Sequence, residues 1–320
     1  MTIPALVDQD IQPFDQLADA SGDDFDLTLG VGNEETELID ALVGKRVLFT
    51  TSRLKVTDSV LDGAPDLELV AKIGTGIDSI DIEAANERGV SVMHTPGLNA
   101  LSVAEHAVTL MLTISRNVRL SQEEIRGGKW RDNIELGDPI VGRTIGLIGF
   151  GNVGSRVAGL LAGFNVEILA YDPYVHEIDT EITGATLTDF DTVVESADAL
   201  VVVAELTDET RGMINMDVFD RMKDSAILVN VARGPIVNQS DLVHALEQDL
   251  IKTAALDVFE EEPLDSNHIL HQFDDVVLTP HIAGTASGTR ERIISTLVGN
   301  ARRFFHEERI ADRFFATERF

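Results

Sequence analysis

The sequence contains no cysteine, which excludes disulfide bonds, thiolate catalysis and cysteine-bound zinc. Aromatic residues make up only 5% of the chain, with one tryptophan. No stretch approaches the run of about 18 apolar residues that a membrane-spanning helix needs. The first ten residues also lack the basic cluster and apolar run of a secretory signal. We therefore expect a cytoplasmic protein with no membrane partner.

Basic residues are scarce as well, because 25 lysines and arginines face 55 acidic residues for a net charge of −30. Such a chain repels phosphate backbones and anionic lipids, so we expect no nucleic-acid partner. The acidic residues are spread along the chain. An acidic surface for binding proteins is one interpretation. We favour a halophilic one, in which a solvated acidic shell suits molar salt, where the Debye length is only about 3 Å.

The 320 residues, 44% of them hydrophobic, predict about two domains with a core in each. Short apolar runs alternate with helical stretches such as Glu34–Leu42, Val56–Gly63 and Ile82–Arg88. This rhythm predicts parallel strands buried on both faces. The strands expected in the first hundred residues are Pro4–Val7, Phe25–Leu29, Val47–Thr50, Leu69–Ile73 and Val90–Met93.

One long helix is expected next, over Ser102–Arg119, with Ser102 as N-cap and Glu105 as its capping-box partner. The alternation then restarts with helices such as Asn152–Ala162, Met216–Arg221 and Gln239–Gln248, and a last helix covers Thr289–Phe305. We therefore predict an α/β protein with a doubly wound nucleotide-binding domain. Its six expected strands are Thr144–Ile148, Val166–Tyr171, Ala199–Val203, Ile227–Val231, Ala254–Val258 and Val276–Thr279.

A glycine motif follows the first of these six strands and opens a helix. Gly149 permits a tight turn, Gly151 lets the backbone approach a pyrophosphate, and Gly154 lets helix and strand pack closely. The free amides of the helix N-terminus favour phosphates. Asp172 ends the next strand, where an acid accepts hydrogen bonds from ribose hydroxyls and repels a 2′-phosphate. The motif predicts a site for NAD rather than NADP.

Three residues suited to 2-oxoacid chemistry follow later strands. Arg233 offers a planar fork for a carboxylate or a carbonyl. His281 belongs to the residue type most often used as a general acid/base and can supply the proton that follows hydride delivery. Glu262 can fix the tautomer of His281. Since the carboxyl ends of parallel strands face the ligand, we expect Arg233, Glu262 and His281 to converge.

The order of these motifs resembles that of the D-isomer-specific 2-hydroxyacid dehydrogenases. The matching stretches are Lys72–Asp78, Gly149–Gly154, Asn230–Pro235, Leu256–Pro263 and Thr279–His281.

This resemblance implies two Rossmann-like doubly wound domains with the active-site cleft between them, and a homodimer. It places the substrate domain at residues 1–100 plus 290–320, and the NAD domain at 101–289. His281 would be the acid/base, Glu262 its partner and Arg233 the substrate arginine. The substrate contacts that the resemblance implies are Lys72, Gly74, Thr75, Gly76, Arg233 and His281. Beyond the motif glycines and Asp172, the implied cofactor contacts are Thr75, Asn152, Val153, Ala204, Val231, Ala232, Arg233, Asp257, His281, Ala283 and Gly284.

The resemblance leaves the substrate open. Neutral residues near the implied carboxylate site favour a small 2-oxoacid such as glyoxylate, hydroxypyruvate or pyruvate. A 3-phosphoglycerate dehydrogenase is the alternative, because Lys72 matches a basic position of those enzymes, although Thr51 stands where an arginine is expected, with Arg53 two positions on. Their regulatory C-terminal domain would be absent. Formate dehydrogenases carry glutamine where Glu262 stands, which disfavours that activity.

A different class remains as a further alternative, namely an NAD-sensing corepressor that binds NADH without turnover. The intact Arg233, Glu262 and His281 favour the enzyme. We expect no metal site: His268 and His271 have helix-like spacing but no evident third ligand. His106, on the long helix, is interpreted as a core or interface residue.

Overall fold

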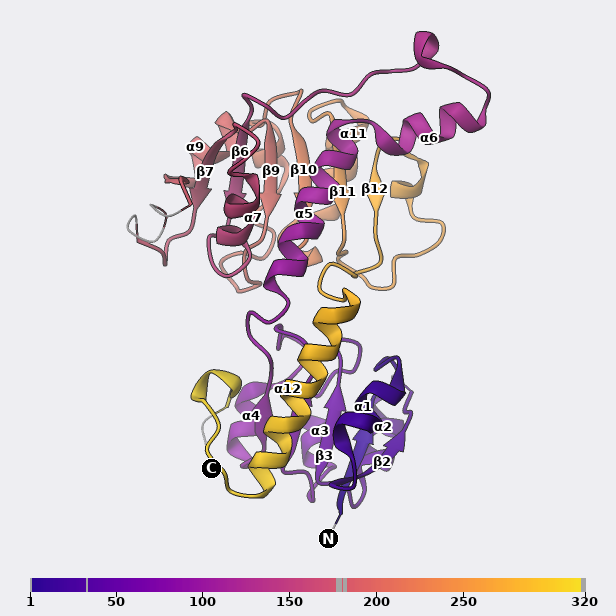
Figure 1. Ribbon diagram of the computed structural model, residues 1–320, viewed down its shortest axis with the longest axis vertical. Coiled ribbons are helices and arrows are strands. Elements are labelled where there is room, and N and C mark those ends of the chain that lie inside the picture. The colour runs from indigo at the N-terminus through magenta and orange to yellow at the C-terminus, as the bar shows by residue number, and fades with distance from the viewer. Residues whose placement is uncertain (1, 33, 177–179, 181–182, 318–320) are drawn as a thin grey trace. The chain divides into compact units, whose positions relative to one another are not determined.

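The computed structural model describes residues 2–32, 34–176, 180 and 183–317. The chain forms two compact units, unit 1 (Met1–Asn99 and Gly284–Phe320) and unit 2 (Ala100–Ala283). Each is built around a parallel sheet with helices, which confirms the predicted α/β class of two doubly wound domains (Figure 1). The second junction, expected near residue 290, lies instead between Ala283 and Gly284.

The sheet of unit 1 has the strand order β2-β1-β3-β4-β5, with every neighbouring pair parallel. This is the order of flavodoxin-like doubly wound sheets, in which ligands bind at the carboxyl edge. Its strands are β1 (Ile3–Val7), β2 (Phe25–Leu29), β3 (Val47–Thr50), β4 (Leu69–Lys72) and β5 (Ser91–Met93). Its helices are α1 (Phe14–Ser21), α2 (Glu35–Leu42), α3 (Asp58–Asp62), α4 (Ile82–Glu87), α12 (Ser287–Phe305) and the 3₁₀ turn η4 (Asp312–Phe314).

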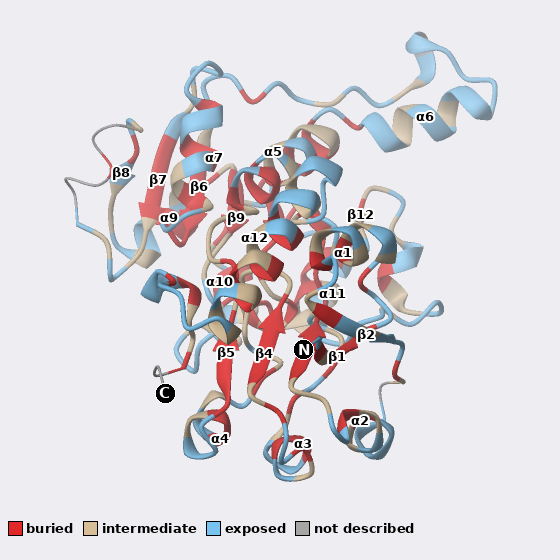
Figure 2. Ribbon diagram, turned by 60° about the horizontal axis from the view of Figure 1, so that its bottom comes forward, coloured by how far each residue is buried: buried red, intermediate tan, exposed pale blue. Residues whose placement is uncertain are grey.

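The inner strands β1, β3 and β4 of unit 1 are buried on both faces, because each face of the sheet has its own helical cover (Figure 2). On one face, Phe49 and Leu69 pack with α12 through Ile294 and Leu297. On the other face, Leu48 packs in a core that draws on α2, α3 and α4. This two-sided burial explains why these strands read as continuous apolar runs.

The sheet of unit 2 has the order β12-β11-β10-β9-β6-β7-β8, again with parallel neighbours. Its strands are β6 (Thr144–Ile148), β7 (Glu167–Tyr171), β8 (Thr186–Leu187), β9 (Ala199–Val202), β10 (Ile227–Asn230), β11 (Thr253–Leu256) and β12 (Val277–Leu278). Its helices are α5 (Ala100–Ser115), α6 (Val118–Arg126), α7 (Gly154–Leu161), α9 (Phe190–Ser196), α10 (Met216–Phe219) and α11 (Gln239–Glu247), with 3₁₀ turns η1 (Arg131–Asn133), η2 (Gly234–Ile236) and η3 (Ile269–Gln272).

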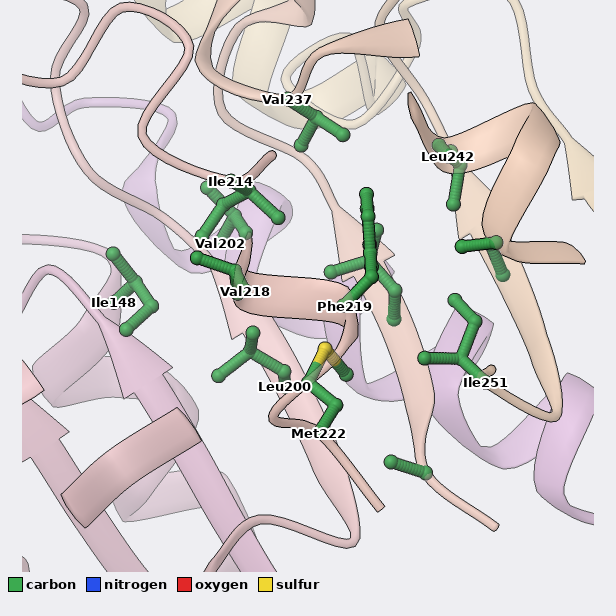
Figure 3. Packing of buried hydrophobic residues seen from close by; sticks show 14 of the residues in the cluster. Ile148, Leu200, Val202, Ile214, Val218, Phe219, Met222, Val237, Leu242 and Ile251 are labelled. Carbon is green, nitrogen blue, oxygen red and sulfur yellow. The ribbon is translucent and has the colours of Figure 1, made fainter. Parts of the chain in front are cut away.

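The strand order reverses at β6, which pairs with β7 on one side and β9 on the other. The crevice at such a reversal is where doubly wound sheets bind dinucleotides. One face of the sheet is closed by a core around Phe219, Leu200 and Ile214 (Figure 3). The other face is covered by α5 and α7.

The prediction of a single helix over Ser102–Arg119 is wrong in two respects. The observed helix α5 begins at Ala100, so Ser102 lies inside the helix and is not its N-cap. It also ends at Ser115, because Asn117 takes a left-handed φ of 49° before α6 begins. Asparagine tolerates that conformation better than most residues. Among the described residues, no helix is both long and apolar enough to cross a bilayer.

Candidate active site

The glycine motif of unit 2 forms the turn between β6 and α7. A Cβ at Gly149 (φ 97°) would lie 2.7 Å from the backbone of Ala204, and one at Gly154 would lie 2.3 Å from the carbonyl oxygen of Gly149. Gly151 differs, since a Cβ there would meet no atom within 4 Å. Two glycines thus close the turn, while Gly151 leaves open space beside the N-terminus of α7, where Asn152 and Val153 precede the helix. This fits a phosphate approaching the backbone.

Asp172 follows β7 and joins that strand to the glycine turn. Its Oδ2 accepts the amide N–H of Phe150 at 2.8 Å, and its Oδ1 accepts that of Tyr174 at 3.0 Å. A carboxylate oxygen accepts more than one hydrogen bond, so both retain capacity for ribose hydroxyls. Asp172 therefore holds the turn together in addition to its predicted contact with the cofactor.

Arg233 follows the segment Val231-Ala232 at the carboxyl end of β10. The buried Asn230 organises this segment, because its Oδ1 accepts the N–H of Ala232 at 3.1 Å and its amide donates to the carbonyl of Arg233 at 3.2 Å. The guanidinium donates to the carbonyl of Ala232 at 2.7 Å. A Cβ at Gly234 would lie 1.8 Å from the backbone of Phe259, so the arginine loop packs directly on the turn that leads to Glu262.

Asp257 follows β11 and is fully buried. Its Oδ1 accepts the hydroxyl of Thr279 at 2.5 Å and the N–H of Ile282 at 3.0 Å, and its Oδ2 accepts the N–H of Ala283 at 2.8 Å. Burial alone would raise the pKa of Asp257. Hydrogen bonds from His106, from Thr279 and from the two amides outweigh it, and the pKa lies below its ordinary value.

His281 lies in the loop that Asp257 holds. Its amide donates to the carbonyl of Asp257 at 2.8 Å, and its Nδ1 lies 2.7 Å from Oε2 of Glu262. The other oxygen of Glu262 accepts the N–H of Phe259 at 3.0 Å. The backbone of His281 has a φ of 52°, a left-handed conformation that costs a non-glycine residue of order 1–3 kcal/mol and is found at functional sites.

The neighbouring Glu260 has different partners. Its Oε1 accepts the amide N–H of Gln239 at 2.9 Å, and its own amide donates to Gln239 at 3.3 Å. The glutamate paired with His281 is therefore the one that precedes Pro263.

In unit 1, the segment Gly74–Gly76 lies just beyond β4. Gly74 has a φ of 120°, which requires glycine, and its carbonyl accepts both the amide and the hydroxyl of Thr95 at 3.0 Å. The Thr75 hydroxyl lies 2.7 Å from Oδ1 of Asn99, and its carbonyl accepts Nδ1 of His94 at 2.8 Å. A Cβ at Gly284 would lie 2.7 Å from the amide nitrogen of Asn99. The carbonyl of Gly74 is thus occupied by Thr95.

Two basic residues near the carboxyl ends of β3 and β4, Lys72 and Arg53, have partners within unit 1. Lys72, only 1% exposed, donates from Nζ to the hydroxyl of Ser52 at 2.9 Å. Arg53 forms ion pairs with the buried Asp8 at 2.6 Å and with Asp10 at 2.9 Å. Asp8 also accepts the hydroxyl of Thr51 at 2.6 Å.

More than half of the chain matches a known protein family. Residues 108–283 match the model of the "D-isomer specific 2-hydroxyacid dehydrogenase, NAD binding domain". The chain belongs to this family. The family, the two-domain fold and the NAD cofactor inferred from the motifs are thereby confirmed.

Two curated relatives match over most of their own length. The chain is 39% identical to a glyoxylate reductase of Thermofilum pendens over 269 residues (82% of this chain and 79% of the relative). It is 36% identical to a hydroxypyruvate reductase of Thermotoga maritima, covering 83% of this chain and 86% of the relative. A D-3-phosphoglycerate dehydrogenase of Archaeoglobus fulgidus is 39% identical over 81% of this chain, but the chain spans only 49% of that protein.

Among solved structures, the NAD complex of a formate dehydrogenase from Staphylococcus aureus is 29% identical, with a TM-score of 0.86 over 99% of both chains. The TT0316 protein of Thermus thermophilus is also 29% identical, with a TM-score of 0.88 over 96% of this chain and 98% of that one.

The residues predicted for the site fall into two groups. In unit 2, Glu262 and His281 are in direct contact, and the loop of Arg233 packs on the turn before Glu262. Thr75, Gly284 and the carboxylate-site residues belong to unit 1. The contact of His106 with Asp257 was missed, because nothing in the local sequence links a helix residue to an aspartate 151 positions later (257 − 106).

Proposed function

We propose that this chain reversibly reduces a small, unphosphorylated 2-oxoacid to its D-2-hydroxyacid with NADH. The observation that supports it most is the His281–Glu262 pair, held at the carboxyl edge of the NAD-domain sheet beside the loop of Arg233. Its setting is that of a general acid/base: a histidine, a carboxylate that orients it, and an arginine fork nearby.

The cofactor site has features that suit NAD. Gly151 leaves room beside the amides of the first turn of α7, and Asp172 presents a carboxylate at the end of β7. A carboxylate there favours ribose hydroxyls and repels a 2′-phosphate. The D configuration of the product is inferred from the family to which the chain belongs.

Each reacting residue has one task in this proposal. When bound, NADH would supply the hydride for the carbonyl carbon of the substrate. His281 donates a proton from Nε2 to the carbonyl oxygen, while its Nδ1–H stays with Glu262, which holds one ring orientation. Arg233 binds the substrate through its planar fork. The amides of Gly74, Thr75 and Gly76 bind the carboxylate.

The charges of unit 1 support an unphosphorylated substrate. A phosphate favours a cation whose charge is not already balanced, but the charge of Arg53 is balanced by Asp8 and Asp10, and its Nη2 also donates to the carbonyl of Val31 at 3.2 Å. The buried carboxylate of Asp8 would itself repel a phosphate. The phosphoglycerate dehydrogenase alternative keeps the support of Lys72 and of the relatives that bear that name.

The test is NADH oxidation by the purified protein in molar KCl with glyoxylate, hydroxypyruvate, pyruvate and phosphohydroxypyruvate, and with NADPH in parallel. We expect turnover of one unphosphorylated acid with NADH preferred. Arg233→Lys should raise the KM for that acid about tenfold or more, because the paired hydrogen bonds are lost. Turnover of phosphohydroxypyruvate alone would establish the alternative, and NADH binding with no turnover would refute the enzyme.

We further propose a homodimer formed through an arm of unit 2, which we define as α6 and the segment up to Val141. Figure 1 shows α6 and the chain after it extending away from the sheet of unit 2. No residue of α6 is buried. Exposed apolar side chains gather along the arm, which is what a subunit contact would cover: Val118 (53%), Ile125 (54%), Trp130 (64%), Leu136 (75%) and Val141 (55%).

Light scattering tests the dimer. The double variant Trp130→Ser/Leu136→Ser should run as a monomer, because two large apolar contacts are removed. Val43→Ser, at an exposed position (70%) in unit 1, is the matched control and should stay dimeric. A monomeric wild type, or a double variant that remains dimeric, would refute the proposal.

A further inference from the structure

His106 lies on α5, far in sequence from the residues proposed to react, yet it contacts two residues that shape the His281 loop. Its Nε2 lies 3.0 Å from the hydroxyl oxygen of Thr279 and 3.4 Å from Oδ1 of Asp257. The side chain is 19% exposed, and Asp257 is completely buried. The imidazole therefore closes one side of the Asp257 carboxylate.

The direction of the hydrogen bonds follows from the proton count. Asp257 has a lowered pKa and is ionised at neutral pH, so it only accepts. The single hydroxyl proton of Thr279 goes to Asp257 at 2.5 Å. Toward His106, the Thr279 oxygen can then only accept, as can Asp257. Nε2 of His106 must therefore carry a proton and donate to this pair.

The residues that Asp257 binds surround His281 on both sides. Its carboxylate accepts from Thr279, two residues before His281, and from the amides of Ile282 and Ala283 directly after it. Its carbonyl accepts the amide of His281. A left-handed backbone at a histidine persists only where its surroundings over-determine it. Asp257 provides those surroundings, and His106 is a side-chain donor from outside the loop.

We propose that His106 is a positioning residue, whose Nε2–H donation to Thr279 and Asp257 holds the loop of residues 279–283 so that His281 faces Glu262. This rests on the proposed function in so far as His281 is the acid/base. His106 does not touch the reacting atoms, and its effect passes through Asp257.

Two substitutions separate the donor from the bulk of the side chain. His106→Leu removes the donor. His106→Gln places an amide Nε2–H near the position of the ring Nε2. We expect His106→Leu to lower kcat about 10- to 100-fold with the Kd for NADH changed less than about threefold, because small displacements of a reacting group cost this much. His106→Gln should stay within about threefold of wild type.

Thr109→Val is the matched control on the same helix, at an exposed position where the hydroxyl donates to the carbonyl of Glu105, and it should leave kcat unchanged. Thermal unfolding of each variant establishes that it is folded. If His106→Leu does not fold, His106→Gln decides: folded protein with kcat reduced tenfold or more would overturn the donor role. A folded His106→Leu with wild-type kcat would overturn it as well.

Histidine ring NMR with ¹⁵N-labelled protein, with His281→Gln used for assignment, is independent of turnover. We expect Nε2 of His106 to be protonated in the wild type. We expect His281 to show one tautomer, with the proton on Nδ1, in the wild type and in His106→Gln. In His106→Leu, His281 should show a mixture of tautomers. A bare Nε2 at His106, or an unchanged His281 spectrum in His106→Leu, would overturn the proposal. If wild type turns over no 2-oxoacid, the proposed function fails while these spectra still decide the role of His106.

Discussion

Nδ1 of His281 lies 2.7 Å from Oε2 of Glu262, and the second oxygen of that carboxylate is held by the amide of Phe259. The glutamate is thus fixed at one end by the backbone and orients the imidazole with the other. Both side chains are 35% exposed, so the pair is open to solvent and to a substrate.

Glu262→Gln should lower kcat about 10- to 100-fold, because a charge-assisted hydrogen bond of about 1.5–3 kcal/mol is replaced by a neutral one. The amide also cannot accept from both Phe259 and His281 with its two ends. Steady-state kinetics with NADH and the preferred 2-oxoacid measure this, with Glu261→Gln as the adjacent control. A Glu262→Gln enzyme with wild-type kcat would contradict the assigned role.

Asp172→Asn should shift cofactor preference toward NADPH by about tenfold or more, because the charge that repels a 2′-phosphate is gone. Stability should fall by about 1–3 kcal/mol if the amide group faces the N–H of Phe150 or Tyr174. The ratio of kcat/KM for NADPH and NADH gives the first effect, and urea unfolding the second. No change in that ratio would mean that Asp172 does not face the 2′ position.

The buried Asp257 should contribute to acid lability. A carboxyl whose pKa is lowered on folding stabilises the protein above its unfolded pKa of about 3.9, and that contribution is lost as the pH falls through the folded value. Unfolding free energies of wild type and Asp257→Asn, measured from pH 6 to pH 3, should therefore converge toward the acid end. Asp26→Asn, at an exposed position, should run parallel to wild type. Parallel curves for Asp257→Asn would contradict the lowered pKa.

Gly234→Ala should be strongly destabilising, by about 3 kcal/mol or more, because the new methyl group would lie 1.8 Å from the backbone of Phe259. Gly159→Ala is the matched control. It lies inside α7 with no atom within 4 Å of the added Cβ, and alanine should stabilise the helix by about 0.5–1 kcal/mol. Thermal unfolding compares the two. A neutral Gly234→Ala would show that the arginine loop can move away from Phe259.

The charge of −30 should make stability depend on salt. Raising KCl from 0.1 M to 2 M shortens the Debye length from about 10 Å to below about 3 Å and removes most of the self-repulsion. We expect Tm to rise by at least about 5 °C. Sucrose at matched water activity is the control: it is excluded from the protein surface but does not screen the repulsion between charges. A Tm that is flat or falls with KCl would contradict a halophilic protein.

The positions of most strands along the chain were predictable because each is a short apolar run followed by a turn, and β1 to β5 lie within two residues of their expected bounds. The break at Asn117 was missed, because the apolar pattern continues through it and only a single backbone angle ends the helix. β8 was missed too, because Thr186 and Leu187 are not part of an apolar run, whereas the equally short β12 is. Short strands and backbone angles are set by tertiary contacts rather than by periodicity.

The candidate site divides in the same way. Residue types at strand ends were enough to predict Arg233, Glu262 and His281, since the carboxyl edge of a parallel sheet is fixed by topology. The Asp257–His106 contact joins segments that no local pattern connects, and the left-handed backbone of His281 has no signature in its residue type, so neither could be predicted from the sequence. Lys72 was expected at the substrate, and its bond to Ser52 within unit 1 emerged only from the fold.

The passage of the chain from unit 1 into unit 2 and back has a consequence during synthesis. The face of the first sheet that carries Phe49 and Leu69 is covered by α12, which is made about 190 residues after β5. At a synthesis rate of roughly 5–20 residues per second, that apolar face stays exposed for roughly 10–40 s before α12 is made. Unit 2 is contiguous and can fold meanwhile. The nascent chain should therefore need a chaperone, or the solubility that its acidic residues provide, until Ile294 and Leu297 emerge.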